Sequence, residues 1–275
     1  MATALVTGGT SGIGAQFARQ LAARGYDLVV VARDADRLAS TAAEIHAAWG
    51  INVETLRADL GVRGDVDRVA ARIEDSERPI DFLVNNAGFG VHTPLASPDT
   101  STHEHAFDVM CRAVLVLSAA AARAMTARGT GVILNVSSLQ SLITTGSYSA
   151  IKAWVTSFTQ SLAVELRGTG VTVTALLPGW VSTEWHERAG VRTSSIPDWL
   201  WTNPEQVVRI ALRDVDRGRV ICIPTVRYRV LGWFAHHLPR STVRWISGKI
   251  SARRRAPHPE AGGSEHPVVR ADGER

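Results

Sequence analysis

The 275-residue sequence has few of the features that would point to a metalloprotein, a secreted protein or a membrane-spanning protein. Its only cysteines, Cys111 and Cys222, lack metal-site spacing, so we predict no metal centre and no disulfide, and we expect a reducing cytoplasm. We recognise no signal peptide, and no run of about 18 apolar residues predicts a membrane span. With 45% hydrophobic and 20% charged residues, the composition is that of an ordinary globular protein.

Lysine is also scarce, with two residues against 28 arginines, yet Lys152 lies four positions after Tyr148. If residues 148–158 form a helix, both side chains share one face. A neighbouring ammonium lowers the pKa of a phenol from about 10, which would let Tyr148 exchange a proton near neutral pH. Arginine could not replace the lysine, because its charge is diffuse and its geometry rigid. Taken alone, this pair is weak evidence for catalysis, because a tyrosine and a lysine at the same spacing also occur on ordinary surface helices.

Apolar runs alternate with amphipathic stretches throughout the first 225 residues. We predict strands over residues 2–7, 27–32, 52–56, 80–84, 131–136 and 171–176. Helices are expected after the first glycine cluster, over 37–49, 66–73 and 102–125, and around Tyr148. This alternation predicts an α/β fold: a single Rossmann-type doubly wound parallel sheet with helices on both faces. Residues 1–225 would form that domain, 226–255 an amphipathic basic segment and 256–275 a disordered tail.

Three glycines, Gly8, Gly12 and Gly14, lie between the first predicted strand and the first helix. A glycine turn there lets the backbone approach a pyrophosphate, and the helix N-terminus supplies N–H donors. The spacing is G-x-x-x-G-x-G and differs from the general dinucleotide fingerprint. An ordinary turn is the alternative interpretation.

The end of the second predicted strand should select the cofactor. An acidic residue there would accept a hydrogen bond from the 2′-hydroxyl of NAD, whereas an arginine would pair with a 2′-phosphate. The sequence has Arg33 at this point and no acid before Asp34, which favours NADP(H). The alternative is that Arg33 is only a solvent-facing loop residue.

Five motifs in the same order resemble the short-chain dehydrogenase/reductase family, over roughly residues 2–225. They are Thr7-Gly8-x-x-x-Gly12-Ile13-Gly14, Asp59-Leu60, Asn85-Asn86-Ala87-Gly88, Val136-Ser137-Ser138 with Tyr148-x-x-x-Lys152, and Pro178-Gly179-Trp180-Val181-Ser182-Thr183.

The resemblance implies that Tyr148 donates a proton to a substrate carbonyl oxygen, that Ser138 hydrogen-bonds this oxygen, and that Lys152 lowers the tyrosine pKa and holds the nicotinamide ribose. Ser137 is the fallback for Ser138, and Asp59 is alternatively a simple turn residue. The implied cofactor-binding residues are Gly8, Thr10, Ser11, Gly12, Ile13, Gly14, Arg33, Asp59, Leu60, Asn86, Ala87, Gly88, Tyr148, Lys152, Pro178, Gly179, Val181 and Thr183.

One position departs from the family pattern. Many members carry an asparagine in the long helix before the catalytic strand, where it connects the lysine to a water chain. Aligning that helix places Met110 there, and a thioether cannot donate a hydrogen bond. Three interpretations stay open: the proton is resupplied through another chain of waters, turnover is slow, or this protein has lost catalysis. We favour the first, because the serine, tyrosine and lysine are all present.

The C-terminal third is rich in tryptophan and basic residues. Six of the eight tryptophans fall between 180 and 245, and those at 185, 199 and 201, with Leu200, are candidates for an apolar lid over the substrate; the alternative is core or oligomer packing. An apolar carbonyl compound, such as an acyl, lipid or steroid-like ketone, would suit such a lid. Residues 1–216 carry 18 basic and 22 acidic residues, whereas 217–275 carry 12 and 4. The basic stretch 228–255 therefore either packs on the protein or contacts a membrane peripherally.

The leading functional hypothesis is an NADPH-dependent carbonyl reductase. The alternatives are an NAD-dependent alcohol dehydrogenase, which Arg33 argues against, and a cofactor-binding sensor or scaffold with little turnover, which only Met110 supports. Family resemblance implies a homodimer or homotetramer. The C-terminal arginines alone do not justify a prediction of nucleic-acid binding.

Overall fold

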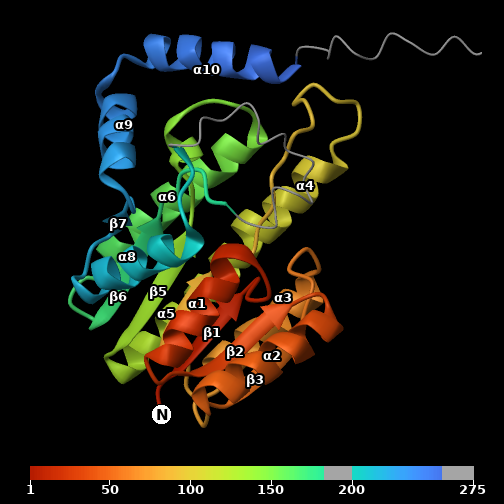
Figure 1. Cartoon of the computed structure of the whole chain (residues 1–275), viewed down its shortest axis with the longest axis vertical. Helices are drawn as coiled ribbons and strands as arrows, with labels where there is room; N and C mark the ends of the chain where they lie inside the picture. The colour runs from red at the N-terminus through yellow and green to blue at the C-terminus, as the bar shows by residue number, and fades with distance from the viewer. Residues whose placement is uncertain (183–199, 256–275) are drawn as a thin grey trace, which may run out of the picture.

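The computed structural model describes residues 1–182 and 200–255, and its centre is a seven-stranded sheet in the order β3-β2-β1-β4-β5-β6-β7 (Figure 1). All adjacent strands of this sheet run parallel. The strands are β1 (Thr3–Thr7), β2 (Asp27–Ala32), β3 (Val53–Arg57), β4 (Phe82–Asn85), β5 (Gly131–Val136), β6 (Val171–Leu176) and β7 (Ile221–Cys222). The predicted α/β fold is confirmed.

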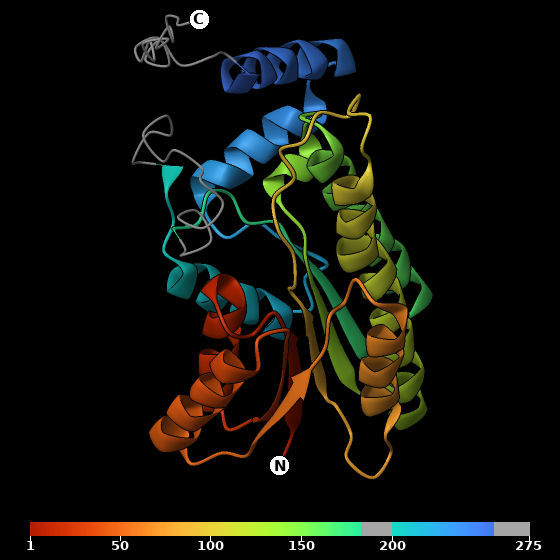
Figure 2. The same cartoon turned by 90° about the vertical axis from the view of Figure 1, so that its right-hand side faces the viewer.

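Helices cover both faces because the central strands are apolar on both sides. Leu5 of β1 enters one core, whereas its neighbours Ala4 and Val6 enter the other. The helices on the first face are α3 (Arg63–Glu74), α5 (Ala113–Arg128) and α6 (Ser147–Glu165), and those on the second are α1 (Gly12–Ala23), α2 (Ala35–Trp49) and α8 (Pro204–Asp216). Seen at a right angle to the first view, the sheet lies between these two layers (Figure 2).

The long helix predicted over residues 102–125 consists of three segments. They are α4 (Ser101–Phe107), the π-helical turn η1 (Asp108–Arg112) and α5. Together Ser101–Arg128 is long and apolar enough to span a membrane by length and composition, which corrects the prediction that no such run exists. Alanine supplies much of this apolar character, and 61% of the most apolar window is buried inside the protein. We therefore interpret it as a core helix.

Two elements at the end of the sheet were missed in the sequence. The strand β7 has two residues, too few to give a periodic pattern. Helix α8 does have a recognisable start: the side chain of Asn203 caps it by accepting a hydrogen bond from the Glu205 N–H at 2.8 Å, and Pro204 occupies the first turn.

Two further helices, α9 (Val226–His237) and α10 (Arg240–Arg255), follow β7. In both views α10 lies at the end of the molecule, beyond the carboxyl ends of the strands (Figures 1 and 2). Residues 256–275, for which the sequence predicts a tail, lie outside the described residues.

The strand order reverses between β1 and β4, with β2 and β3 on one side and β5 to β7 on the other. In open α/β sheets this switch point leaves a crevice at the carboxyl ends of the strands, where dinucleotides bind. The segments that follow β1, β2, β4, β5 and β6 all begin at this edge.

Candidate active site

The turn between β1 and α1 needs its glycines for steric reasons. Gly8 and Gly12 have φ angles of 65° and 53°, in the left-handed region. A β-carbon on Gly14 would lie 2.1 Å from the Gly8 carbonyl oxygen, so the first turn of α1 lies directly against the glycine turn. Ser11, the residue before α1, makes no side-chain cap, which leaves the N–H groups of the first turn for another acceptor. This bare, closely approached backbone fits the pyrophosphate of a dinucleotide.

The loop after β4 is fastened to that turn by two polar side chains. The Thr7 hydroxyl accepts hydrogen bonds from the N–H groups of Asn86 (2.9 Å) and Ala87 (3.1 Å). The Asn86 amide in turn donates to the carbonyls of Thr7 (3.0 Å) and Gly8 (3.3 Å). Thr7, to which the sequence analysis assigned no role, therefore helps to set the width of the crevice.

Arginines gather at the carboxyl end of β2. Arg33 is exposed, and Arg57 Nε donates to its carbonyl at 3.1 Å. Arg37 donates to the Thr10 carbonyl in the glycine turn at 3.2 Å, so it lies beside the predicted cofactor cradle. The nearest acid, Asp34, caps α2 by accepting from two N–H groups of its first turn. Arg37 was missed because only the strand-end position was considered, although it lies four residues after Arg33.

The predicted adenine contact, Asp59-Leu60, follows β3. Leu60 is buried, and the Asp59 carboxylate accepts from the Gly61 N–H at 2.9 Å and so closes a tight turn. The Asp59 N–H donates to Asp65 at 2.7 Å. At least one carboxylate oxygen of Asp59 therefore has a structural partner.

Tyr148 and Lys152 lie one helical turn apart near the start of α6. Lys152 is buried, with 4% of its surface exposed, and its Nζ donates to the Val136 carbonyl at 2.8 Å. The same Nζ lies 5.7 Å from the centroid of the Tyr148 ring. Ser138, on the segment after β5, is hydrogen-bonded to the Tyr148 side chain. The structure thus brings all three predicted catalytic side chains together.

The pKa of Tyr148 moves opposite to the sequence prediction. Burial raises the pKa of Tyr148 to about 12, and the hydrogen bond with Ser138 offsets only part of this rise. Burial also lowers the pKa of Lys152 to about 8, against a smaller opposing effect of Cys111. The prediction failed because it considered the ammonium charge and left out the cost of desolvating a phenolate. At neutral pH the phenol carries its proton, which is the form that a proton donor requires.

The two adjacent serines have different partners. The Ser137 hydroxyl lies 2.7 Å from the Lys152 carbonyl oxygen and 2.7 Å from Thr156 Oγ1. The Ser138 hydroxyl accepts from the Gln140 N–H at 3.1 Å and faces Tyr148. This geometry favours Ser138 over Ser137 as the residue that meets a substrate oxygen.

A buried polar chain fixes α6 relative to the sheet. Asn85 Nδ2 donates to Ser118 Oγ (3.0 Å) and to Asn135 Oδ1 (2.9 Å), and Asn135 Nδ2 donates to Thr159 Oγ1 (3.0 Å). These residues come from β4, α5, β5 and α6. Because buried amides need all these partners, the register of α6, and with it the position of Tyr148, is tightly set.

Met110, which occupies the position where many family members carry an asparagine, is fully buried in η1. A β-carbon on Gly88 would lie 3.0 Å from Met110 Sδ and 3.7 Å from Lys152 Nζ, so the thioether packs beside the lysine, against Gly88. The next residue, Cys111, is also buried, and burial raises the pKa of its thiol to about 11. The lysine therefore has a sulfur-rich wall on its η1 side.

The loop after β6 is held by Tyr228 of α9. A β-carbon on Gly179 would lie 2.1 Å from the Tyr228 ring, so only glycine fits beneath it. The Tyr228 hydroxyl accepts from the Trp180 N–H at 3.0 Å and donates to the Leu200 carbonyl, which joins the two ends of the intervening segment. Val181 pairs with Thr202 nearby. Of the lid and cofactor predictions, Thr183, Trp185 and Trp199 lie outside the described residues.

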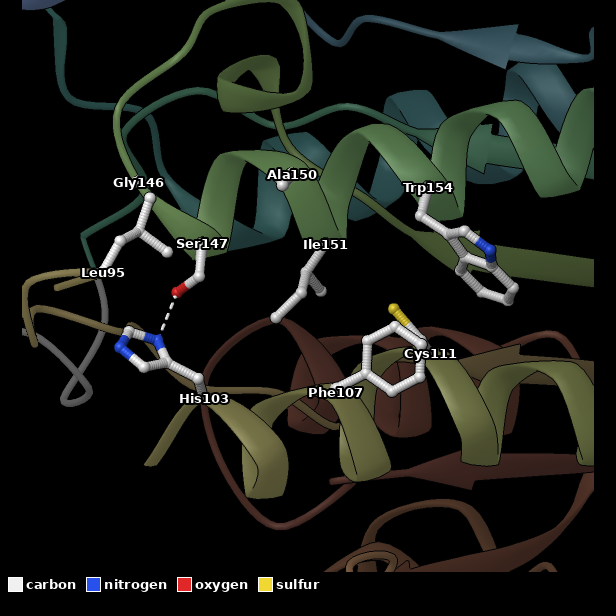
Figure 3. A pocket seen from close by; sticks show the side chains of 9 residues that line it. All are labelled: Leu95, His103, Phe107, Cys111, Gly146, Ser147, Ala150, Ile151 and Trp154. Atoms are coloured by element: carbon white, nitrogen blue, oxygen red, sulfur yellow. Dashed lines mark hydrogen bonds between the residues drawn. The ribbon is translucent and has the colours of Figure 1, made fainter. Parts of the chain in front are cut away.

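A separate apolar cavity of about 390 Å³ lies between α4, η1 and the start of α6 (Figure 3). Phe107, Cys111, Ile151 and Trp154 give it apolar walls. At its other end His103 Nδ1 lies 2.8 Å from the Ser147 hydroxyl oxygen, which ties α4 to α6. Tyr148, Ser138 and Lys152 do not line it, so this cavity lies beside the candidate reaction centre and is not part of it.

The glycine turn at the switch point and the cluster of Ser138, Tyr148 and Lys152 next to it form an arrangement suited to proton and hydride transfer with a bound nucleotide. The family model for short chain dehydrogenase matches residues 2–192, and the chain belongs to the short-chain dehydrogenase/reductase family. It is an oxidoreductase of that family, whose members use a nicotinamide cofactor.

Several relatives match most of the chain. The very-long-chain 3-oxoacyl-CoA reductase of Anas platyrhynchos is 32% identical over 265 residues, covering 93% of this chain and 81% of the duck protein. The galactitol 2-dehydrogenase (L-tagatose-forming) of Cereibacter sphaeroides is 34% identical over 208 residues, covering 74% and 80%. A short-chain dehydrogenase from Sphingobium yanoikuyae, solved in complex with NADPH, superimposes with a TM-score of 0.77 at 31% identity and covers 95% of this chain and 98% of that chain.

Proposed function

We propose that this oxidoreductase reduces a ketone of an apolar substrate to an alcohol with NADPH. The observation that carries the proposal is the Tyr148 phenol, which burial keeps protonated beside the Ser138 hydroxyl. When bound, the nicotinamide cofactor supplies the hydride. Tyr148 donates its proton to the carbonyl oxygen, and Ser138 hydrogen-bonds the same oxygen and orients it. Lys152 donates to the Val136 carbonyl and lies beside the tyrosine ring, and its ammonium would hold the nicotinamide ribose.

The cofactor would lie along the carboxyl edge of the sheet. The glycine turn, with Thr10, Ser11 and Ile13, would hold the pyrophosphate, and Asn86 to Gly88 would line the crevice between the two halves of the sheet. Asp59 and Leu60 would face the adenine, and Pro178, Gly179, Val181 and Thr183 the nicotinamide side. These assignments follow the family motifs and agree with the positions of the described residues at the switch point.

NADPH is the proposed cofactor because arginines gather at the end of β2. Arg33 is exposed there, Arg37 reaches the glycine turn, and the carboxylate of Asp34 caps α2. A 2′-phosphate would meet a guanidinium at this position, whereas the nearest carboxylate, that of Asp34, already accepts two backbone N–H groups through one oxygen. The solved relative from Sphingobium yanoikuyae binds NADPH.

An apolar substrate is favoured over a sugar alcohol by the residues around the loop after β6. Trp180 and Trp201 lie with ring centroids 6.1 Å apart, and Leu200 directly precedes Trp201 in the chain. Apolar walls of this kind favour an acyl, lipid or steroid-like ketone, and the duck relative is named for a 3-oxoacyl substrate. The relative from Cereibacter sphaeroides is named for galactitol, a polar sugar alcohol, so the substrate test has to include polyols.

The deciding experiment measures NADPH oxidation by the purified protein with bulky apolar ketones, 3-oxoacyl thioesters and keto sugars, and alcohol oxidation with galactitol. We expect turnover with the apolar ketones or thioesters, and loss of at least about 100-fold in Tyr148→Phe, because the proton donor is removed. Arg33→Asp should shift preference toward NADH. Turnover confined to sugars, or unchanged in Tyr148→Phe, would refute the proposal.

A cofactor-binding protein without turnover is the second candidate, and Met110 is the observation that favours it. The methionine puts a thioether where many relatives have an amide, next to Lys152. If NADPH bound tightly, by fluorescence titration, and no carbonyl compound in the panel were reduced at any pH, this second function would replace the first.

We also propose a homodimer or homotetramer in a reducing compartment such as the cytoplasm. The helices α4, α5 and α6 expose Phe107, Leu115 and Val164, of which Phe107 also lines the apolar cavity, and burial against a second copy would remove these side chains from water. Both cysteines are free, buried thiols, in agreement with a reducing setting.

A further inference from the structure

Helices α9 and α10 expose a group of large apolar side chains that no other described residue covers. Val226, Val230 and Trp233 of α9 are spaced to share one face and are 71%, 50% and 56% exposed. We call the whole group the docking face; it consists of Val226, Val230, Leu231, Trp233, Phe234, Trp245 and Ile246. Isolated exposed apolar residues are ordinary, but seven on two consecutive helices are an unusual concentration, and such concentrations mark interaction sites.

The same helices carry only positive charge. No aspartate or glutamate occurs between residues 217 and 259, whereas residues 217–255 contain ten arginines and lysines. Arg240, Arg244 and Lys249 of α10 are exposed. The Lys249 ammonium lies 3.9 Å from the ring centroid of Trp245, so a cation and an amphipathic aromatic ring stand side by side.

We propose that the docking face binds the surface of an anionic lipid bilayer. Its apolar side chains would enter the boundary between headgroups and acyl chains, and the surrounding basic groups would meet lipid phosphates and carboxylates. A second copy is a poor occupant, because two such faces would oppose basic residues with no acid on either side. Nucleic acid would neutralise the charge and leave the seven apolar side chains in water.

The other side of the same helices contacts the catalytic loops. Gly232 of α9 lies against Leu139 and Leu142, whose δ-carbons would both lie within 3.5 Å of an added β-carbon, in the segment directly after Ser138. Ser247 of α10 is buried and accepts from the Thr144 N–H at 3.1 Å. In both views α10 lies beyond the carboxyl edge of the sheet (Figures 1 and 2). Docking would therefore bring the substrate side of the site to the bilayer, a consequence that rests on the proposed apolar substrate.

The test is flotation of the full-length protein with unilamellar vesicles of phosphatidylcholine alone or of phosphatidylcholine with phosphatidylserine, at low and high salt. We expect binding to the anionic vesicles that weakens at high salt, and little binding to the neutral ones. Trp233→Glu should weaken binding at least about tenfold, whereas Trp49→Glu, at an exposed tryptophan of α2, should not. Arg244→Glu should weaken it at least about fivefold, whereas Arg209→Glu on α8 should have little effect.

The arginine pair keeps the test valid if Trp233→Glu disturbs α9, and melting curves of all four variants would reveal such a disturbance. Absence of binding to anionic vesicles, or equal losses in the matched controls, would overturn the proposal. So would dissociation of an oligomer by Trp233→Glu with vesicle binding unchanged, because the face would then join two copies. Tyr148→Phe should bind vesicles normally while losing turnover, which separates failure of docking from failure of the proposed reaction.

Discussion

At the scale of single residues, the protonation state of Tyr148 bears on the proton transfer proposed above. Burial raises the pKa of this phenol to about 12, so the proton is present at neutral pH and ready for donation to a carbonyl oxygen. Alcohol oxidation needs the opposite form, a phenolate that accepts a proton. In the proposed mechanism, the protonated phenol is the form that reduction uses at neutral pH.

This protonation state predicts opposite pH profiles for the two directions. Reductive turnover should not fall through loss of the phenol proton until the pH approaches about 12, whereas alcohol oxidation should rise with pH as the phenolate forms. Above about pH 8, loss of the Lys152 charge should weaken cofactor binding in both directions. Initial rates and cofactor affinities measured across a pH series would check this. Fastest alcohol oxidation at acidic pH would contradict it.

Met110 gives a second prediction at this scale. Met110→Asn introduces an amide beside Lys152, and we expect turnover to stay the same or rise, because the amide can both donate and accept hydrogen bonds. Burying it should lower the free energy of unfolding by about 1–3 kcal/mol, measured by denaturant titration. Met110→Leu, which preserves the apolar packing, is the matched control. A large loss of turnover in the asparagine variant alone would assign the methionine a packing or substrate role.

At the scale of elements, the glycine turn and α1 depend on one very close approach. In Gly14→Ala the new β-carbon would lie 2.1 Å from a backbone oxygen, which cannot yield as a flexible side chain would. We expect a loss of about 1–3 kcal/mol in stability and a clearly weaker affinity for NADPH. Gly64→Ala in α3 has no atom within 4 Å of its new methyl group and should be neutral or slightly stabilising. Equal effects of the two changes would exclude this steric account.

Sequence periodicity was sufficient for the strands and most helices of the Rossmann core, since each central strand is a short apolar run and each helix has one apolar face. Predicted and observed bounds agree fully for β2, β5 and β6. Periodicity did not reveal the π-helical turn η1, because such a turn leaves the apolar pattern of the helix unchanged. It also did not reveal strand β7, because two residues are too few to show a period. Within the site, the sequence motifs predicted that Ser138, Tyr148 and Lys152 lie close together, as they do in the structure. The Arg37 contact with Thr10 and the direction of the tyrosine pKa depend on burial and tertiary contact, which no local pattern encodes.

At the scale of the whole molecule, the exposed apolar surface of the α4–α6 layer predicts self-association. Val164→Arg places a charge on the outer side of α6, where the wild-type side chain is 64% exposed, and should shift the protein toward a monomer in light-scattering chromatography. Val62→Arg, at a site 52% exposed at the start of α3, is the matched control and should leave the mass unchanged. An unchanged mass in both variants would place the interface elsewhere.

The buried chain from Asn85 through Ser118 and Asn135 to Thr159 also constrains how this sequence can diverge. Each member satisfies a neighbour, so replacing Asn135 by leucine would leave one N–H of the Asn85 amide without its partner, at a cost of about 1–3 kcal/mol, while the Thr159 hydroxyl would keep its bond to the Val155 carbonyl. Replacing the whole group with apolar residues of similar shape would cost much less. The four positions are therefore energetically coupled, and we expect apolar substitutions there to be tolerated better together than one at a time.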